Sequence, residues 1–482
     1  MSLSPTFQSI LPEALLLILS VVVLTLEPFW NEDRRRNLGW VTAAGLLITL
    51  VVCLLLGRPA GPITTLGGAI RFDWLAFFFE MLFIFAACMT ALLLMDHANV
   101  GRRGEAYALM LASTIGMCLM ASAADLIMLY LAIETTSIPL YVLAGFMLTD
   151  DRSTESGFKY LLYGAMTSAV MLYGFSLLFG FAGTTNIYAL AAAVQDGQVP
   201  LGAVLGVIFL IIVGIGFKVS IVPFHFWAPD VYEGSPTPVA GFLSTASKAA
   251  GFAVLARLFL IAFSGVVVNW TLVLAVLSAI TMTVGNLLAL PQKNVKRLLA
   301  YSSIAHAGYA MIGIVAVSQL GIASVAYYML AYVVTNLAAF GIAMAVGRAT
   351  GSDDYDAYRG LSRRSPWLAL IMLAAFLSLA GMPPFGGFIA KVVVFAAGIE
   401  AGYVWLVVLG ILNSVIGVYY YLNVIKYVYL YRMEGEAEQN HPIEVPRSYI
   451  LALTVLTIGI ILVGTVFAPW FGYASAAAAN LF

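Results

Sequence analysis

Five ionisable side chains lie deep within apolar stretches of the sequence, where a charge is hard to accommodate. They are an acid, three lysines and a histidine: Glu134, Lys218, Lys248, Lys391 and His306. A charge at the centre of a bilayer costs at least ~2.5–3.5 kcal/mol on insertion scales. Such residues are therefore expected only where they have a partner or a function. Carboxylates, amines and imidazoles all bind and release protons. Their types and depth together predict a path for protons through a membrane.

The acid of this set, Glu134, is predicted to pair with Lys218. It lies in LYLAIETTSIPLY, near the middle of its apolar run, with Tyr130 and Ser137 on the same helix face. A nearby carboxylate favours the charged lysine, whereas burial favours the neutral one, so a small movement of either group could load or release a proton. A static ion pair is the alternative interpretation.

Two further lysines extend the row. Lys248, in GFLSTASKAAGF, lies too deep in its run for the side chain to reach the interface easily, and Ser244 and Thr245 share its helix face. Lys391 follows a Gly/Pro-rich break and completes the row. Both lysines are therefore expected to have a function in the membrane interior.

The histidine is open to two interpretations. His306 lies in YSSIAHAGY, in the middle of an apolar run, with Ser302, Ser303 and Tyr309 on its helix face. An imidazole titrates near neutral pH and is a natural proton shuttle. A lone histidine is also often a hydrogen-bonded core residue, and the sequence does not separate the two.

Other charges near the ends of apolar runs are expected to be structural. Arg257 and Lys426 lie near such ends and are predicted to extend to the interface. Glu13 is predicted to be interfacial, and Asp230 and Glu233 to fix the geometry of a loop.

Composition excludes a water-soluble protein. Hydrophobic residues make up 62% of the 482 positions and charged residues only 10%, against about a quarter charged in soluble domains. The net charge of −1 gives no reason to expect nucleic acid. The three cysteines and four histidines have no metal-ligand spacing, and the sequence contains no GxGxxG or GxxxxGK[ST] motif. We therefore expect no metal, nucleotide or redox cofactor in this chain.

The apolar runs predict an all-α polytopic membrane protein, because a span needs about 20 mostly apolar residues. About fourteen spans are expected, at approximately 10–28, 38–57, 72–95, 104–121, 124–148, 157–181, 201–226, 238–263, 270–290, 297–317, 322–347, 366–398, 403–431 and 449–470. The connections are short, so residues 1–482 are predicted to form a single transmembrane domain. Spanning backbones must satisfy their own hydrogen bonds, which leaves a helical bundle as the architecture.

Spans seven and twelve are predicted to be broken helices. Span seven reads VGIGFKVSIVPFHFW, with Pro223, and span twelve reads LAGMPPFGGFIAKVVVF, with Pro383 and Pro384. Proline in a helix interior removes a backbone hydrogen bond and clashes with the preceding turn. The breaks lie five spans apart, so spans 4–8 and 9–13 form two inverted five-helix repeats, a layout in which the site lies at the broken helices.

These repeats divide the chain into four parts: three N-terminal spans in 1–100, a first repeat in 104–263, a second in 270–431 and a last span in 449–470. Almost all loop lysines and arginines follow odd-numbered spans, whereas only Arg58 and Arg71 follow even-numbered ones. By the positive-inside rule, both termini lie on the outer side.

Three long motifs carry a resemblance to a known family. FKVSIVPFHFWAPDVYEGSPTPVAGFLS, QKNVKRLLAYSSIAHAGY and LAGMPPFGGFIAK resemble the antiporter-like membrane subunits of the proton-translocating NADH:quinone oxidoreductase, respiratory complex I. The stretch DVYEGSPTPV resembles subunit N rather than L or M, and subunit M would show a glutamate at Lys391. The resemblance covers almost the whole chain.

This resemblance implies a role for each residue of the row. Glu134, Lys218, Lys248 and Lys391 match the proton path of the family, and His306 lies on the same axis with a less certain role. It implies a subunit of an enzyme whose quinone, flavin and iron–sulfur clusters are held by partner subunits. The implied surroundings are membrane lipids and other complex I membrane subunits, including M and K, in a bacterial inner membrane with both termini periplasmic.

Two alternatives remain open at this point. The first is a subunit of a multisubunit Na⁺/H⁺ antiporter, which would be a transporter and no part of a redox enzyme. The second is a purely structural subunit of the membrane arm. In that case, removing the buried charges would impair assembly and leave pumping by the assembled protein intact.

Overall fold

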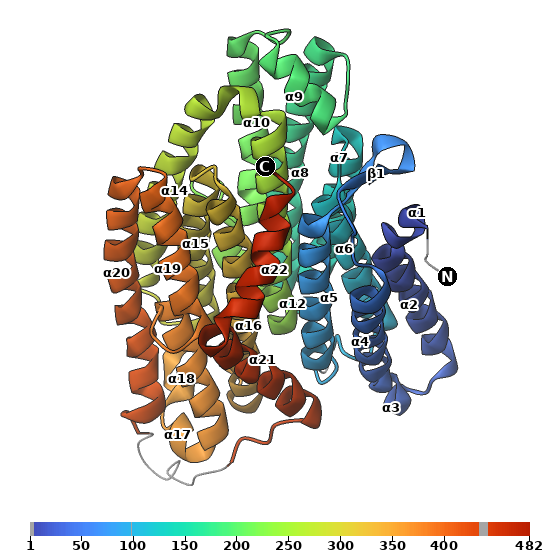
Figure 1. The fold of residues 1–482 in the computed structure, drawn as a ribbon. Coiled ribbons are helices and arrows are strands. Elements are labelled where there is room, and N and C mark those ends of the chain that lie inside the picture. Colours follow the sequence, from blue (N-terminus) through green and yellow to red (C-terminus); the bar gives the residue numbers. More distant parts are fainter. Residues whose placement is uncertain (1–3, 98, 433–441) are drawn as a thin grey trace.

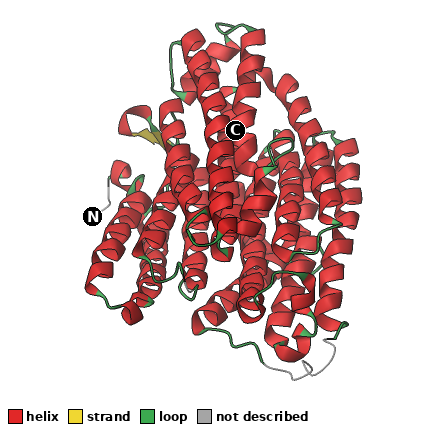
Figure 2. Cartoon of the chain, turned by 180° about the vertical axis from the view of Figure 1, so that it is seen from behind, coloured by secondary structure: helices red, strands yellow, loops and turns green. Residues whose placement is uncertain are grey.

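Long apolar helices make up almost all of the chain, as Figures 1 and 2 show. The structure is a computed structural model that describes residues 4–97, 99–432 and 442–482. In this described part, thirteen helices are long and apolar enough to cross a membrane. The broken pair α18 (Pro366–Ala380) and α19 (Gly386–Glu400) supplies the remaining span that the sequence predicts. The predicted class, an all-α polytopic membrane protein, is confirmed.

The N-terminal part contains three spanning helices and a small hairpin. The hairpin pairs Ile63 with Phe72 in antiparallel register. The elements in chain order are α1 (Pro5–Gln8), α2 (Leu11–Leu26), η1 (Glu27–Phe29), α3 (Glu32–Arg35), α4 (Asn37–Leu56), β1 (Ile63–Thr65), η2 (Leu66–Gly68), β2 (Ile70–Phe72) and α5 (Trp74–Leu94). Asp73 begins α5 by accepting a hydrogen bond from the Ala76 backbone N–H, as a helix N-cap does.

Five spans follow, of which the fourth is broken and the fifth contains π-helical turns. In chain order the elements are α6 (Gly104–Ser122), α7 (Leu126–Ala144), α8 (Asp151–Ala182), α9 (Ile187–Gln195), α10 (Leu201–Val219), α11 (Trp227–Gly234), α12 (Thr237–Phe242), the π-segment η3 (Leu243–Ser247), α13 (Lys248–Arg257) and the π-segment η4 (Leu258–Ala262). Helix α8 packs against both α7 and α10.

The next spans repeat this order. The elements are η5 (Ser264–Val266), α14 (Val267–Ala289), α15 (Val295–Val315), α16 (Gln319–Thr350), η6 (Tyr355–Tyr358), α17 (Leu361–Arg364), α18, α19, α20 (Val404–Tyr429), α21 (Arg447–Thr465) and α22 (Phe467–Ala479). Helix α16 is buried along almost its whole length, because α5, α12, α15, α18, α19, α21 and α22 all pack against it.

The last span differs from its predicted boundaries of 449–470. Helix α21 ends at Thr465, and α22 continues to Ala479 after a bend at Val466. Figure 1 shows α22 rising from α21 alongside the other helices, and it packs on α16 and α5. The span itself is Arg447–Thr465, and α22 is a separate helix of 13 residues that was not predicted from the sequence.

The two predicted breaks are confirmed, and they have the same local geometry. Helix α10 ends at Val219 and α18 ends at Ala380, and the residue after each, Ser220 and Gly381, has a left-handed conformation with φ of 60° and 83°. The backbone N–H of each of these residues bonds carbonyls of the last turn, which is how helices commonly end. Both breaks contain a cis proline, at Val222–Pro223 and Pro383–Pro384.

Matched hydrogen bonds also occur at the ends of the second and third helices of each five-span group. In each group, two loop segments pair through two backbone bonds of 2.8–2.9 Å. They are Leu126 N to Thr185 O and Ile187 N to Ala124 O in the first group, and Val295 N to Asp353 O and Tyr355 N to Lys293 O in the second. Helices α8 and α16 have the same length, 32 residues.

Candidate proton path

The three lysines of the row are buried, with between 1% and 6% of their surface exposed. Lys218 lies in the last turn of α10, directly before the break. A cation is favoured at a helix C-terminus, where carbonyl groups have no partner within the helix. In the described chain, Lys218 Nζ has no hydrogen-bond partner.

No oxygen of Glu134 lies within 4.0 Å of Lys218 Nζ, so the two residues predicted to pair are not in direct contact in this structure. Ser168 of α8 instead donates a short hydrogen bond to Glu134 Oε1. The physical reason is the packing order, because α8 contacts both α7 and α10 and supplies the nearer partner. Ser137, expected to serve the carboxylate, donates to the carbonyl of Ile133 in its own helix.

A small cavity is lined by both Ser168 and Lys218. Its volume is about 10 Å³, and its walls come from α7, α8 and α10. Lys218, Ser168 and Tyr141 all line it. Glu134 is therefore connected to the cavity through Ser168, with Lys218 on the cavity wall.

Lys248 is held by the second five-span group although it belongs to the first. Its Nζ donates to the carbonyl and the hydroxyl of Ser303 in α15, at 2.7 and 2.9 Å. It follows directly after the π-segment η3, a local distortion that is frequent at functional sites. Ser244 and Thr245, expected on the same helix face, have other partners, since Ser244 accepts from Asn336 and Thr245 donates to Gly241 O.

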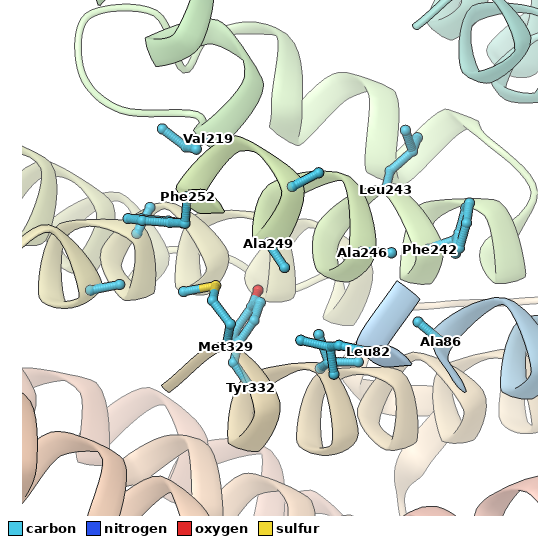
Figure 3. Close-up of a cluster of buried hydrophobic side chains, with 14 of the residues drawn as sticks. Leu82, Ala86, Val219, Phe242, Leu243, Ala246, Ala249, Phe252, Met329 and Tyr332 are labelled. Atoms are coloured by element: carbon cyan, nitrogen blue, oxygen red, sulfur yellow. The ribbon is translucent and has the colours of Figure 1, made fainter. Parts of the chain in front are cut away.

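Apolar side chains surround the helix that carries Lys248. Figure 3 shows them in close-up, with residues of the span-eight helix facing those of α5 and α16. The labelled side chains are Leu82, Ala86, Val219, Phe242, Leu243, Ala246, Ala249, Phe252, Met329 and Tyr332. In the described chain, both hydrogen bonds of the Lys248 amine are to Ser303.

His306 is bonded at both ring nitrogens. Nδ1 lies 2.6 Å from the Tyr328 hydroxyl, and Nε2 lies 3.2 Å from the Tyr421 hydroxyl. Ser302 also bonds the Tyr421 hydroxyl, while the ring of Tyr309 packs edge-on against the imidazole at 5.8 Å. An imidazole bonded on both sides can accept a proton at one nitrogen while releasing one at the other.

Lys391 reaches back to the break that precedes it. Its Nζ donates to the carbonyls of Leu379 and Ala380 at 3.0 and 2.9 Å and to the Ser414 hydroxyl at 2.8 Å. The two carbonyls belong to the last turn of α18 and are free because the helix stops at Gly381. Three acceptors match the three N–H donors of an ammonium group.

Of the two basic residues near span ends, one differs from expectation. Arg257 is only 2% exposed and does not extend to the interface as predicted. It forms two bonds of 2.8 Å to the carboxylate of Asp73, at the start of α5. Lys426, in contrast, is exposed. Position near the end of a span does not reveal which way a side chain faces, and Arg257 faces the N-terminal helices.

Sequence reasoning missed two buried acids in the N-terminal spans. Glu13 is buried where an interfacial position was expected, and Glu80 of α5 is buried as well. Glu80 lies in FFFEMLF, inside a predicted span, so the rule that selected Glu134 would also have selected it. The hydroxyls of Ser168, Tyr328 and Tyr421 were also missed, because sequence shows no signal for contacts between helices.

A polar cluster closes the end of the broken span seven. Asp230 of α11 bonds Lys159 of α8 at 2.7 Å and Arg297 of α15 at 2.9 Å, and Arg297 also bonds Glu233 at 2.8 Å. These ion pairs join α8, α11 and α15. Across the residues that the structure describes, no group of three or more His, Cys, Asp or Glu side chains is placed to bind a metal ion.

Comparison with known proteins places this fold in one class. Residues 123–417 match the family described as NADH:quinone oxidoreductase/Mrp antiporter, transmembrane. The structure superposes on a chain of respiratory complex I from Thermus thermophilus with a TM-score of 0.79 and 33% identity, covering 96% of this chain and 98% of that one. A chain of the Mrp complex from a Dietzia species has the same fold, with a TM-score of 0.87 at 19% identity and 99% and 97% coverage.

The fold and the row of buried amines thus define a polytopic, antiporter-like membrane subunit. Within this class, the chain is 43% identical to NADH-quinone oxidoreductase subunit N of Moorella thermoacetica, over 98% of both chains. It is 42% identical to the subunit N of Heliobacterium modesticaldum, over 94% of both chains. The chain belongs to the subunit N family of NADH-quinone oxidoreductase.

Proposed function

We propose that this chain moves protons across the membrane as part of NADH:quinone oxidoreductase, with Glu134, Lys218, Lys248, His306 and Lys391 as the proton carriers. The observation that carries the proposal is the surroundings of the three lysines. Each amine is buried, and no carboxylate lies within 4.0 Å of it in the described chain. A buried amine without a fixed counter-ion can exist in both charge states, which proton transport requires.

The contacts support an order along the path. Lys248 bonds Ser303, and the neighbouring Ser302 bonds the phenol that reaches His306. His306 and Leu379 line one further cavity of about 10 Å³, and Lys391 donates to the Leu379 carbonyl. These contacts connect Lys248 in the first group to Lys391 in the second, and we place Glu134 and Lys218 before Lys248 in the proposed order.

We further propose the domain layout and surroundings predicted above. The matched breaks and loop hydrogen bonds support two inverted repeats, 104–263 and 270–431, after the N-terminal spans of 1–100 and before the last span. The bacterial inner membrane, with both termini periplasmic, agrees with the charge bias of the loops. Subunits M and K are proposed neighbours, and quinone, flavin and iron–sulfur clusters are assigned to partner subunits.

A subunit of an Na⁺/H⁺ antiporter is the second candidate, since the Mrp complex shares the fold. The identity of 42–43% to subunit N over nearly the whole chain favours the oxidoreductase. Deletion of the chain separates the two. Loss of quinone-dependent NADH oxidation in membranes supports the first, whereas a growth defect confined to high sodium supports the second.

The test of the proton path uses matched lysine variants in the assembled complex. We expect Lys248→Met and Lys391→Met to lower proton pumping at least about tenfold, since groups that transfer protons typically contribute more than this. Lys426→Met is the control, because Lys426 lies in a span but is exposed. Pumping is measured with a pH-sensitive dye in vesicles, per complex assembled. Wild-type pumping by both buried-lysine variants contradicts the proposal.

A further inference from the structure

Ser168 of α8 lies between the two groups that open the path. Its hydroxyl donates to Glu134 Oε1, and its side chain also lines the cavity of about 10 Å³ on whose wall Lys218 lies. Lys218 Nζ is buried and, in the described chain, makes no hydrogen bond. Ser168 therefore bonds Glu134 directly and lines the same cavity as Lys218.

We propose that Ser168 joins Lys218 and Glu134 into one proton-transfer unit, through a single water molecule held in this cavity. This inference rests on the proton-carrying role proposed for these two residues. The volume suits one water molecule, for which a cavity of about 10–15 Å³ is enough. Such a water needs two to four polar partners, and Lys218, Ser168 and Tyr141 all line the cavity.

The transfer balances without a redox step. The ammonium of Lys218 gives a proton to the water, the water gives one to Ser168 Oγ, and the Ser168 hydroxyl gives its own to the Glu134 carboxylate. One N–H bond breaks, one carboxyl O–H bond forms, and two neutral groups replace two separate opposite charges. A serine hydroxyl suits this step because it donates one hydrogen bond and accepts two.

Other hydroxyls on the cavity wall do not serve Glu134. Ser137 donates to Ile133 O, and Thr167 donates to Tyr163 O, both within their own helices. A hydroxyl that donates its proton to a helix carbonyl cannot donate the same proton to Glu134. Within the described residues, Ser168 is the wall hydroxyl that bonds a carboxylate, so it is the specific connection.

The second five-span group has a comparable arrangement. There, a hydroxyl of the third helix, that of Tyr328 in α16, bonds the ionisable residue of the second helix, His306 in α15. A cavity of the same volume lies between α15, α16 and the broken helix, lined by both residues. The same arrangement therefore occurs in both five-span groups. In each, a hydroxyl of the third helix bonds the ionisable residue of the second helix and lines a cavity next to the broken fourth helix.

Three substitutions at one position test the hydroxyl itself. Ser168→Thr keeps it, whereas Ser168→Val has nearly the same shape as threonine without it, and Ser168→Ala removes it with the least packing change. Thr167→Val is the control, because it removes a neighbouring wall hydroxyl that bonds only its own helix. Each variant is made in the whole complex, and pumping is normalised to the amount assembled in the membrane.

We expect Ser168→Ala and Ser168→Val to pump about tenfold more slowly than wild type. This effect is smaller than is typical for proton-transfer groups, because water can partly replace the hydroxyl. Ser168→Thr and Thr167→Val should pump at close to the wild-type rate. A structural role alone would not separate threonine from valine at equal assembly.

Equal pumping by Ser168→Thr and Ser168→Val overturns the inference. Glu134→Gln and Lys218→Met are measured in the same membranes to show which idea has failed. If these two lose pumping while Ser168→Val does not, the connection through Ser168 is wrong and the proposed path stands. If these two also pump normally, the proposed path itself is wrong.

Discussion

Arg257 and Asp73 form a two-pronged ion pair, with Nη1–Oδ2 and Nη2–Oδ1 both at 2.8 Å. The pair joins the end of α13 to the start of α5 and lies fully inside the protein. Arg257 also bonds Ala121 O at 3.0 Å and the Tyr188 hydroxyl at 3.2 Å. This side chain therefore ties the first five-span group to the N-terminal spans.

Breaking this pair should destabilise the protein strongly. Arg257→Met leaves the buried Asp73 carboxylate with only Arg71, whose Nε lies 4.0 Å away, and loss of one member of a buried pair typically costs about 3–5 kcal/mol. The measurement is the thermal denaturation midpoint of the complex in mild detergent, together with the amount assembled. Lys426→Met, which removes an exposed cation, is the control. An unchanged midpoint for Arg257→Met would show that the pair contributes little.

The positions of the helix breaks could be predicted because their cause is local. Pro223, Pro383 and Pro384 remove backbone donors wherever they occur in a helix, and the structure ends α10 and α18 four and three residues before the first proline of each break. The location of Lys248 and Lys391 deep within spans could also be predicted, because apolar residues flank them on both sides.

The contacts of these residues could not be predicted, because they depend on which helix lies next to which. Ser168 is 34 residues from Glu134, and Tyr421 is 115 residues from His306. The sequence also could not show that α8 packs against both α7 and α10. Because of this packing, Glu134 bonds Ser168 of α8, and Ser168 and Lys218 line one cavity. Arg257 shows the same difficulty, since its neighbour Asp73 is 184 residues away.

Gly387 should be essential to the second break. A Cβ at this position would lie 1.9 Å from the Ser378 carbonyl oxygen of α18, so Gly387→Ala must push α19 away from α18. Overpacking of this kind typically costs about 1–3 kcal/mol. Because Lys391 bonds the carbonyls of α18 from α19, we also expect slower pumping. Gly472→Ala is the control, since a Cβ there meets nothing within 4 Å. Normal stability and pumping by Gly387→Ala would contradict this close packing.

Tyr328 should matter for transport through its hydroxyl. Tyr328→Phe removes the partner of His306 Nδ1, so the imidazole loses one of the two bonds that orient it. We expect pumping to fall about fivefold to tenfold, the loss for one hydrogen bond of ~1–1.5 kcal/mol. Tyr327→Phe is a matched control, because the neighbouring Tyr327 hydroxyl bonds Val463 O in α21. Similar rates for the two variants would mean that Tyr328 acts only in packing.

His97 should make the protein sensitive to mild acid. It lies in the connection after α5, where burial and then the charges of Lys296 and Arg348 lower its pKa to about 4. An unfolded histidine has a pKa of about 6.5, so acidification protonates the unfolded chain first. Stability is therefore lost progressively as the pH falls from about 6.5 towards 4, by up to roughly 3 kcal/mol.

Two variants separate His97 from other acid-sensitive groups, with the denaturation midpoint of the complex measured across this pH range. His97→Gln carries no titrating ring, so its midpoint should fall less steeply with acid than that of the wild type. Arg348→Gln removes one of the two cations that oppose protonation of His97. The pKa of His97 in the folded protein should then rise towards its ordinary value, and the loss of stability in acid should become smaller. If both variants lose stability as steeply as the wild type, other groups account for the acid sensitivity.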